Sequence, residues 1–158
     1  MKEDMVITPL GGGQEVGRSC ILIEYRGRTI MLDCGTHPGR EGSDSLPFFD
    51  TIDDASQIDL ILVTHFHIDH CAGLPYFTEK ANFNGKILMT HATKAVMKLL
   101  LSDNIRLQSK ARSLYDEQVL VLFIRINYDS FILYLFLCLF CVTSFNTRIC
   151  KHVLIKLM

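Results

Sequence analysis

Residues 58–70 read Ile-Asp-Leu-Ile-Leu-Val-Thr-His-Phe-His-Ile-Asp-His, and this stretch decides the fold. Its first part, residues 58–64, is a largely apolar run of the kind expected for a strand buried on both faces. Its second part, residues 65–70, follows directly and places three histidines and one aspartate within six positions. The sequence therefore predicts a buried strand that ends at a polar site.

The segments on both sides of this stretch predict further strands and helices. The expected strands are residues 5–10, 19–25, 29–33, 58–64 and 86–90, with a turn at Arg26-Gly27. The expected helices are residues 72–80 and 92–101, with a short helical turn at 47–52. Three strands followed by a β-α-β-α order indicate a mixed α/β sandwich.

The polar site has the composition of a dinuclear metal centre. Imidazole nitrogen and carboxylate oxygen are the ligands that a hydrolytic Zn²⁺ prefers. Where the strand ends, His65 and His67 can turn toward one ion, while Asp69 and His70 serve a second ion. Two such ions can hold a bridging hydroxide and clamp a phosphoryl or acyl oxygen. The carboxyl ends of strands are also where α/β sheets place their ligands.

Four other interpretations of single residues stay open at this point. Asp69 could cap the helix that follows it, in addition to binding metal. Asp33, at the end of the strand 29–33, is either a carboxylate that orients a ligand histidine or a turn-forming residue. His37 and His91 each stand alone, and we expect them to be solvated or hydrogen-bonded rather than metal-bound.

Charge and cysteine usage give weaker indications. Residues 1–118 contain 12 Lys and Arg against 16 Asp and Glu, a net charge of −4, without a polybasic run. The charge pattern therefore predicts no nucleic-acid surface, although a metal ion can hold phosphate by itself. The cysteines are scattered singly in this part, which indicates buried, reduced thiols in an intracellular protein. The six cysteines are Cys20, Cys34, Cys71, Cys138, Cys141 and Cys150.

Residues 12–19 (GGQEVGRS) almost match the phosphate-loop pattern G-x-x-x-x-G-K-[ST]. Arg18 stands where that pattern requires lysine, and the residues after Ser19 read as a strand. A phosphate loop needs a helix there, so that helix N-terminal amides face the phosphates. We therefore expect no nucleotide to bind in this manner, and we interpret the loop as a glycine-rich hairpin connection.

The composition changes after Gln118. Residues 119–158 carry 28 Val, Leu, Ile, Phe, Tyr, Cys or Met among 40 positions and include no Gly, Pro, Ala or Glu. Residues 131–142 form 12 consecutive apolar positions, short of the roughly 20 that span a bilayer. We expect one domain part at residues 1–118 and an aberrant apolar tail, of the composition of translated non-coding sequence, at 119–158. The alternative is a membrane anchor at 131–145.

Several separate motifs resemble the metallo-β-lactamase superfamily. The segment HFHIDH at 65–70 is similar to the superfamily signature. The longer motifs look like the β-CASP branch and, within it, the endonuclease subunits of the cleavage and polyadenylation specificity factor. These motifs are PLGGGQEVGRSC at 9–20, IMLDCG at 30–35, HFHIDHCAGLPYF at 65–77 and MTHATKAVMKLLLSD at 89–103. The resemblance runs from about Val6 to Gln118.

The resemblance implies an αββα sandwich, of which this chain would supply the N-terminal half. It implies two zinc ions, one bound by His65 and His67 and the other by Asp69 and His70, with Asp69 shared between metal binding and catalysis. It implies that Asp33 orients a ligand histidine. The implied function is RNA endonuclease action on pre-mRNA 3′ ends in the nucleus, together with other processing subunits.

The resemblance also implies parts that this sequence does not carry. The family uses a third histidine, a bridging aspartate, a further histidine and an inserted helical domain downstream, and His152 lacks the context of any of these. We therefore expect the 158-residue chain to be catalytically incomplete. Two alternatives remain, namely a thioester or lactam hydrolase of the same superfamily and a non-catalytic truncated product.

Overall fold

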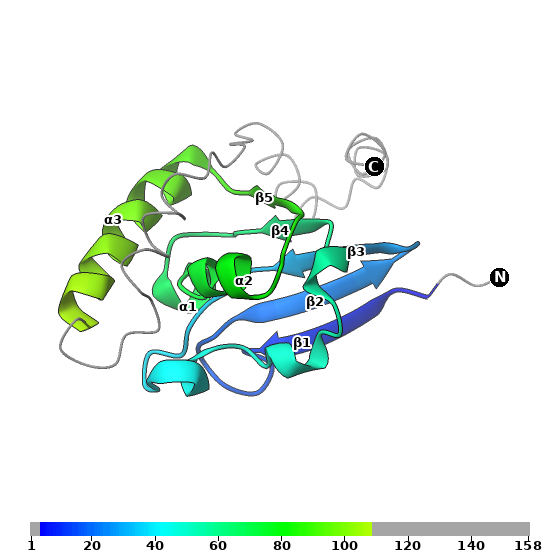
Figure 1. Cartoon of the computed structure of the whole chain (residues 1–158), viewed down its shortest axis with the longest axis horizontal. Helices are drawn as coiled ribbons and strands as arrows, with labels where there is room; N and C mark the ends of the chain where they lie inside the picture. The colour runs from blue at the N-terminus through cyan, green and yellow to red at the C-terminus, as the bar shows by residue number, and fades with distance from the viewer. Residues whose placement is uncertain (1–3, 109–158) are drawn as a thin grey trace, which may run out of the picture.

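The computed structural model describes residues 4–108 of the chain. The strands of this part form one sheet in the order β1-β2-β3-β4-β5, as Figure 1 shows. Their bounds are β1 Val6–Gly11, β2 Cys20–Tyr25, β3 Arg28–Leu32, β4 Leu60–Leu62 and β5 Lys86–Leu88. The α-helices are α1 Ile68–Cys71, α2 Leu74–Lys80 and α3 His91–Gln108. Short 3-10 helices occupy Gly42–Ser45 (η1), Phe49–Thr51 (η2) and Ala55–Gln57 (η3).

The directions of the strands explain why the loops after β1, β3 and β4 meet at one edge of the sheet. β2 is antiparallel to both β1 and β3, whereas β3, β4 and β5 are parallel to one another. Consequently β1, β3, β4 and β5 run the same way, and their carboxyl ends share one edge of the sheet. Arg26 and Gly27, both with positive φ (52° and 71°), form the tight β2–β3 turn at the opposite edge.

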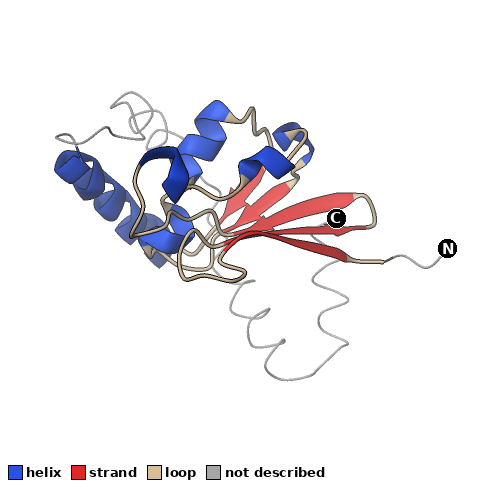
Figure 2. Cartoon of the chain, turned by 90° about the horizontal axis from the view of Figure 1, so that it is seen from below, coloured by secondary structure: helices blue, strands red, loops and turns tan. Residues whose placement is uncertain are grey.

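The helices lie on one face of the sheet, as Figure 2 shows. Side chains of the strands that point toward the helices are buried, among them Met31 of β3 and Ile61 of β4, each fully inaccessible. They pack in one cluster with Phe77 of α2 and Met97 of α3. This layering fixes the register of the strands, because a one-residue slip would turn the buried side chains to the other face.

The predicted strands and the helices predicted at 72–80 and 92–101 are confirmed in their order. The turn α1 and the 3-10 helices η1 and η3 were not predicted, and the other differences lie at the ends of elements. The strand expected at 58–64 is shorter, because the N–H of Thr64 is bound by the Asp33 side chain (2.7 Å) instead of a neighbouring strand. Burial on both faces is wrong for the described residues, since Leu60 and Leu62 stay partly exposed. The last helix is longer than expected, as no Gly or Pro interrupts residues 91–108.

The predicted boundary at Gln118, the apolar tail at 119–158 and the possible anchor at 131–145 all lie outside the described residues. Within residues 4–108, no helix has both the length and the apolar character that a membrane crossing requires.

Candidate metal centre

The polypeptide after β4 is held at the sheet edge by main-chain hydrogen bonds. Residues 68–71 make a single helical turn, α1, which is too short to satisfy its own carbonyl groups. Backbone N–H groups from two other loops donate to them instead. The pairs are Cys34 N to His70 O (2.9 Å), Thr36 N to Ile68 O (3.1 Å) and Ser19 N to Asp69 O (2.9 Å). The positions of the histidine-bearing residues are therefore set by the loops after β1 and β3.

Gly35 makes this arrangement possible, and it is a residue whose role the sequence analysis did not identify. A Cβ atom at position 35 would lie 1.7 Å from the carbonyl oxygen of Asp69 and 2.6 Å from the backbone nitrogen of His70. Both neighbours are main-chain atoms, so they cannot move aside without separating the loop from α1. The motif Asp33-Cys34-Gly35 was the available signal, since a Gly after a strand end often marks close backbone approach.

Asp33 is the centre of the hydrogen-bond network at this edge. It is buried (6% exposed) and adopts a positive φ of 58°, which is uncommon for a residue other than glycine. Its Oδ1 accepts from the backbone N–H of Thr64 at 2.7 Å, and its Oδ2 lies 2.8 Å from Nδ1 of His70. The hydroxyl of Thr64 also donates to Asp33 (2.9 Å). This favours the interpretation of Asp33 as a carboxylate that orients a histidine.

These contacts assign the tautomers of two histidines. An ionised carboxylate only accepts hydrogen bonds, so Nδ1 of His70 carries its proton toward Asp33 and Nε2 keeps a lone pair. The Thr64 hydroxyl donates to Asp33 and therefore accepts from Nδ1 of His65 at 2.9 Å, which leaves Nε2 of His65 with its lone pair. In both rings the free lone pair is on the nitrogen that faces the other donor groups.

The four predicted ligands lie together as two donor pairs. Nε2 of His65 lies 2.9 Å from Nδ1 of His67, and Nε2 of His70 lies 3.5 Å from Oδ2 of Asp69. Two nitrogens on one tetrahedral zinc, at the usual bond length, lie about 3.3 Å apart. The rings of His65 and His70 are also adjacent, with centroids 4.1 Å apart. The donor chemistry and spacing thus fit metal ions, with one pair of donors for each.

Two donors do not complete a metal site. Among residues 4–108, no group of three or more His, Cys, Asp or Glu side chains is arranged to hold one ion. A catalytic zinc generally takes three protein ligands and a water. Within residues 4–108, the two donor pairs therefore do not amount to a complete metal site.

Burial shifts the pKa values of His65 and Cys71 in the directions that favour their neutral forms. Burial lowers the pKa of His65, and the neighbouring His70 and His67 lower it further. Burial also raises the pKa of Cys71 to about 12, with Asp33 and Asp69 adding to the effect. Cys20, Cys34 and Cys71 are free and buried, as expected from their scattered positions, while the other three cysteines lie outside the described residues.

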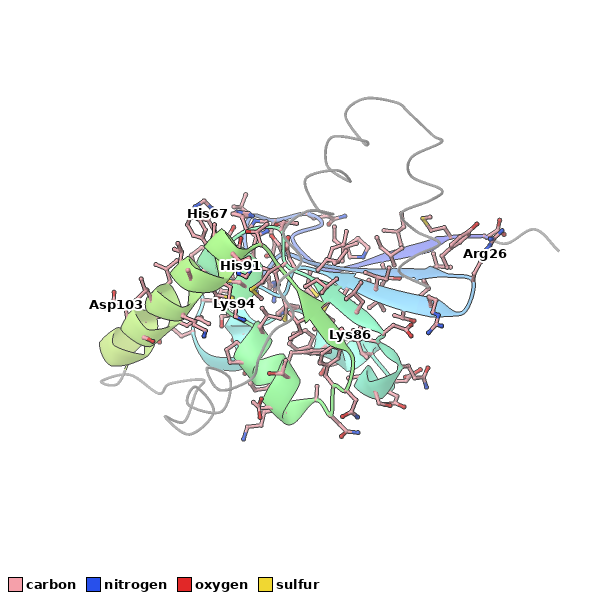
Figure 3. All side chains as sticks on the ribbon, turned by 90° about the horizontal axis from the view of Figure 1, so that it is seen from above. Arg26, His67, Lys86, His91, Lys94 and Asp103 are labelled. Atoms are coloured by element: carbon pink, nitrogen blue, oxygen red, sulfur yellow. The ribbon has the colours of Figure 1, made fainter. Side chains whose placement is uncertain are left out.

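The remaining candidates occupy other positions. Asp69 lies inside α1 and His67 is its N-cap residue, so the prediction of Asp69 as a cap is wrong. Nδ1 of His37 accepts from the N–H of Gly39 at 3.0 Å. His91 begins α3; Figure 3 shows it at the same end of the molecule as His67, with Arg26 at the opposite end. A strand follows Ser19, as predicted for a loop that is not a phosphate loop.

Thr64 is the second functional residue that the sequence analysis missed. Its hydroxyl connects Asp33 to His65, and its backbone N–H also binds Asp33. The only signal was its position directly before His65. A single Thr at a strand end is common, so the pattern alone does not indicate this role.

This chain is similar to several known proteins. Cleavage and polyadenylation specificity factor subunit 3-I of Arabidopsis thaliana is 54% identical over 118 residues, 73% of this chain and 17% of that protein. Endoribonuclease ysh1 of Aspergillus fumigatus is 51% identical over 111 residues, 70% of this chain and 13% of that protein. The solved structure of human tRNase Z, short form, aligns with a TM-score of 0.40 and 20% identity, over 65% of this chain and 40% of that chain.

The chain thus spans less than a fifth of the length of these two curated relatives. The family model described as the metallo-beta-lactamase superfamily matches residues 13–133, which is well over half of the chain. This match establishes that the chain belongs to the metallo-β-lactamase superfamily.

Proposed function

We propose that residues 6–118 form the N-terminal part of the catalytic domain of a zinc-dependent RNA endonuclease that cleaves pre-mRNA at its 3′ end. The main support is the 51% identity to an endoribonuclease over a segment that includes both donor pairs. Identity to a cleavage and polyadenylation specificity factor subunit supports the processing role. By the same argument, the proposed partners are pre-mRNA and other processing subunits, and the proposed location is the nucleus.

The chain's own residues have defined tasks in this proposal. His65 and His67 would hold one zinc ion, Asp69 and His70 the other, and Asp33 fixes the ring of His70 through its 2.8 Å contact. Two zinc ions in such a site supply an activated hydroxide and neutralise charge on the phosphate. A sheet covered by helices on one face fits the half of an αββα sandwich that the resemblance implies.

A second proposal concerns the 158-residue chain on its own. Residues 4–108 provide two donors to each ion, and no further cluster of donors completes either set within this part. We therefore propose that the 158-residue chain alone does not cleave RNA. The two proposals are compatible, because the first concerns the contribution of residues 6–118 to a complete site.

A chimera tests the first proposal. Residues 6–118 of this chain replace the matching segment of the Aspergillus fumigatus endoribonuclease, and cleavage of a labelled RNA carrying a processing site is measured with zinc. We expect metal-dependent cleavage at the site that the parent enzyme cuts. His67→Ala should reduce the rate at least about a thousandfold, because groups that act as one unit are lost together.

His37→Ala is the matched control, because His37 is also a loop histidine but binds only the N–H of Gly39. It should leave the cleavage rate unchanged. A folded chimera that retains zinc and yet cleaves no RNA would contradict the proposal. Cleavage by the His67→Ala chimera at the rate of its parent would contradict the assignment of the donor pairs.

A further inference from the structure

A pocket of about 580 Å³ lies beside the glycine-rich loop that joins β1 to β2. Residues 9–15 line it together with Arg18 and Phe48. The pocket belongs to the same sheet edge as the metal centre, because Ser19, next to Arg18, donates its N–H to the carbonyl of Asp69 (2.9 Å). None of the residues lining the pocket is part of the two donor pairs.

Phe48 presents an aromatic ring at this pocket on a fixed support. The side chain is 54% exposed, so part of the ring surface is open to a ligand. The guanidinium carbon of Arg18 lies 4.1 Å from the centroid of the Phe48 ring, so a cation covers one face of the ring. The N–H of Phe48 donates to the carbonyl of Leu10 (2.8 Å), which ties its backbone to the end of β1.

Arg18 is itself held firmly and is not a mobile surface cation. It is 4% exposed and donates through Nη1 to the carbonyl oxygens of Asp44 (3.3 Å) and Leu46 (3.2 Å). Its Nε is paired with the carboxylate of Glu15. The φ of Arg18 is 40°, and a buried residue other than glycine in this region is typically found where function requires a fixed geometry. The ring of Phe48 therefore rests on a rigid base.

The charges of the lining residues Glu15 and Arg18 cancel, and Arg40 adds a positive charge next to the pocket through its pair with Glu15. Glu15 is paired with Arg18 on one side and with Arg40 on the other, where the distance is 3.2 Å. The three groups together carry a net charge of +1. The side chain of Arg40 is 44% exposed, so this charge reaches the surface. A half-exposed aromatic ring beside a net positive group is the combination that binds unpaired nucleotides, whose bases stack and whose phosphates are attracted.

We propose that this pocket binds one nucleotide of a single-stranded RNA, with the base stacked on Phe48 and the phosphate near the guanidinium group of Arg40. The proposal rests on the proposed function in that RNA is the substrate, and it adds a contact beside the cleavage site. A base within a duplex is already stacked, so the site selects unpaired RNA. This mode differs from a phosphate loop, since no helix follows Ser19.

The test uses the full 158-residue chain without metal, in buffer with EDTA. The probe is a single-stranded RNA octamer carrying 2-aminopurine, whose fluorescence changes when the base stacks on an aromatic ring. We expect binding with a fluorescence change, and weaker binding of the same octamer annealed to its complement. Phe48→Leu keeps an apolar side chain over Arg18 but removes the ring, and it should weaken binding about 5- to 150-fold.

Two variants serve as matched controls. Phe48→Tyr keeps the ring and should bind as the unchanged chain does, with the same fluorescence change. Leu99→Ala truncates another exposed apolar residue, 72% exposed on α3, and should have no effect.

A further variant, Arg40→Gln, tests the phosphate contact. It should weaken RNA binding severalfold and reduce the salt dependence of binding by about one phosphate contact. Far-UV circular dichroism checks that each variant keeps the fold.

The outcomes separate this proposal from the endonuclease proposal. If Phe48→Leu and the unchanged chain bind the RNA probe with the same affinity and the same fluorescence change, the proposal of a nucleotide pocket is wrong. It is also wrong if the probe does not bind at a millimolar concentration of the chain. If the chimera cleaves RNA and Phe48→Leu leaves its KM unchanged, the pocket is wrong and the endonuclease proposal stands. If the chimera is inactive while the full chain binds the probe through Phe48, the pocket stands and the endonuclease proposal fails.

Discussion

Two aspartates make the same kind of contact at opposite ends of the β3–β4 strand pair. Asp33 directly follows β3 and accepts from the backbone N–H of Thr64, just beyond β4, at 2.7 Å. Asp59 directly precedes β4 and accepts from the backbone N–H of Thr29, within β3, at 2.9 Å. Each carboxylate thus joins the end of one strand to its neighbour. We call residues 33–36 with 64–70 the Asp33 end, and residues 28, 29 and 59 the Asp59 end.

The two ends differ in everything else. The side chain of Asp59 is 34% exposed and pairs with Arg28 at 2.6 Å, so its charge is balanced at the surface. Asp33 is buried, has a positive φ and contacts His70. A carboxylate that only joins two strands needs neither burial nor an unfavourable backbone. The strain and burial at Asp33 therefore reflect its second task, which is to hold a histidine ring in one orientation.

Gly35→Ala should have the largest effect and should act on the Asp33 end. The new Cβ would overlap the carbonyl of Asp69 at 1.7 Å, so we expect a loss of more than about 3 kcal/mol in the free energy of unfolding. Gly39→Ala is the control, because its Cβ would meet only His37 ring atoms at 3.4 Å or more. Urea unfolding followed by circular dichroism measures both, and equal stability of the two variants contradicts the close approach.

Zinc content tests whether metal binding is confined to the Asp33 end. The 158-residue chain should retain fewer than two zinc ions after gel filtration, because no group of three or more His, Cys, Asp or Glu side chains in residues 4–108 is arranged to hold an ion, and the proposed assignment gives each ion two donors there. It should also cleave no RNA. His67→Ala should lower the zinc content, whereas Asp59→Asn should not change it. Metal analysis that finds two tightly held ions per chain, or cleavage that depends on His67, would sink this prediction.

Asp33→Asn should weaken metal binding with a moderate loss of stability. Asparagine tolerates the positive φ, but its amide nitrogen would face Nδ1 of His70. Nδ1 of His70 would then accept a hydrogen bond from the amide instead of donating one. The proton of the imidazole would move to Nε2, which would lose the lone pair that faces Asp69. We expect zinc affinity to fall 10- to 100-fold by competition with a chelating dye. Asp59→Asn is the matched control, and a similar fall in both variants would contradict the role of His70.

The sequence predicted the elements well because their patterns are local. The alternation of apolar residues, the Arg26-Gly27 turn and the run before His65 each indicate one element without reference to the rest of the chain. The grouping of four donors at a strand end was also predictable, since the cluster spans six consecutive residues. Local patterns thus predict the order of the elements and the grouping of the four candidate donors.

The interactions between distant loops could not be predicted in this way. The close approach of Gly35 to Asp69 and the bridge from Thr64 to Asp33 join segments about 30 residues apart. Asp69 was interpreted as a possible cap because helix N-caps favour aspartate, yet the turn begins one residue after His67. Main-chain bonds from the β1 and β3 loops fix that start, and no local propensity reports them.

Asp59→Asn should have the smallest effect on the free energy of unfolding. The dependence of this effect on pH tests the role of the Asp59 end. The hydrogen bond from the N–H of Thr29 lowers the pKa of Asp59, and Arg28 lowers it further, while burial opposes both. A lowered folded-state pKa means that the stabilisation is present above the unfolded value of about 3.9 and disappears as the pH falls through the folded value. Because the side chain of Asp59 is 34% exposed and that of Arg28 is 54% exposed, the difference in unfolding free energy at pH 7 should be below about 1 kcal/mol and smaller in high salt. Urea unfolding at pH 7, 5 and 3 measures this, and a difference that grows toward pH 3 would contradict the sign.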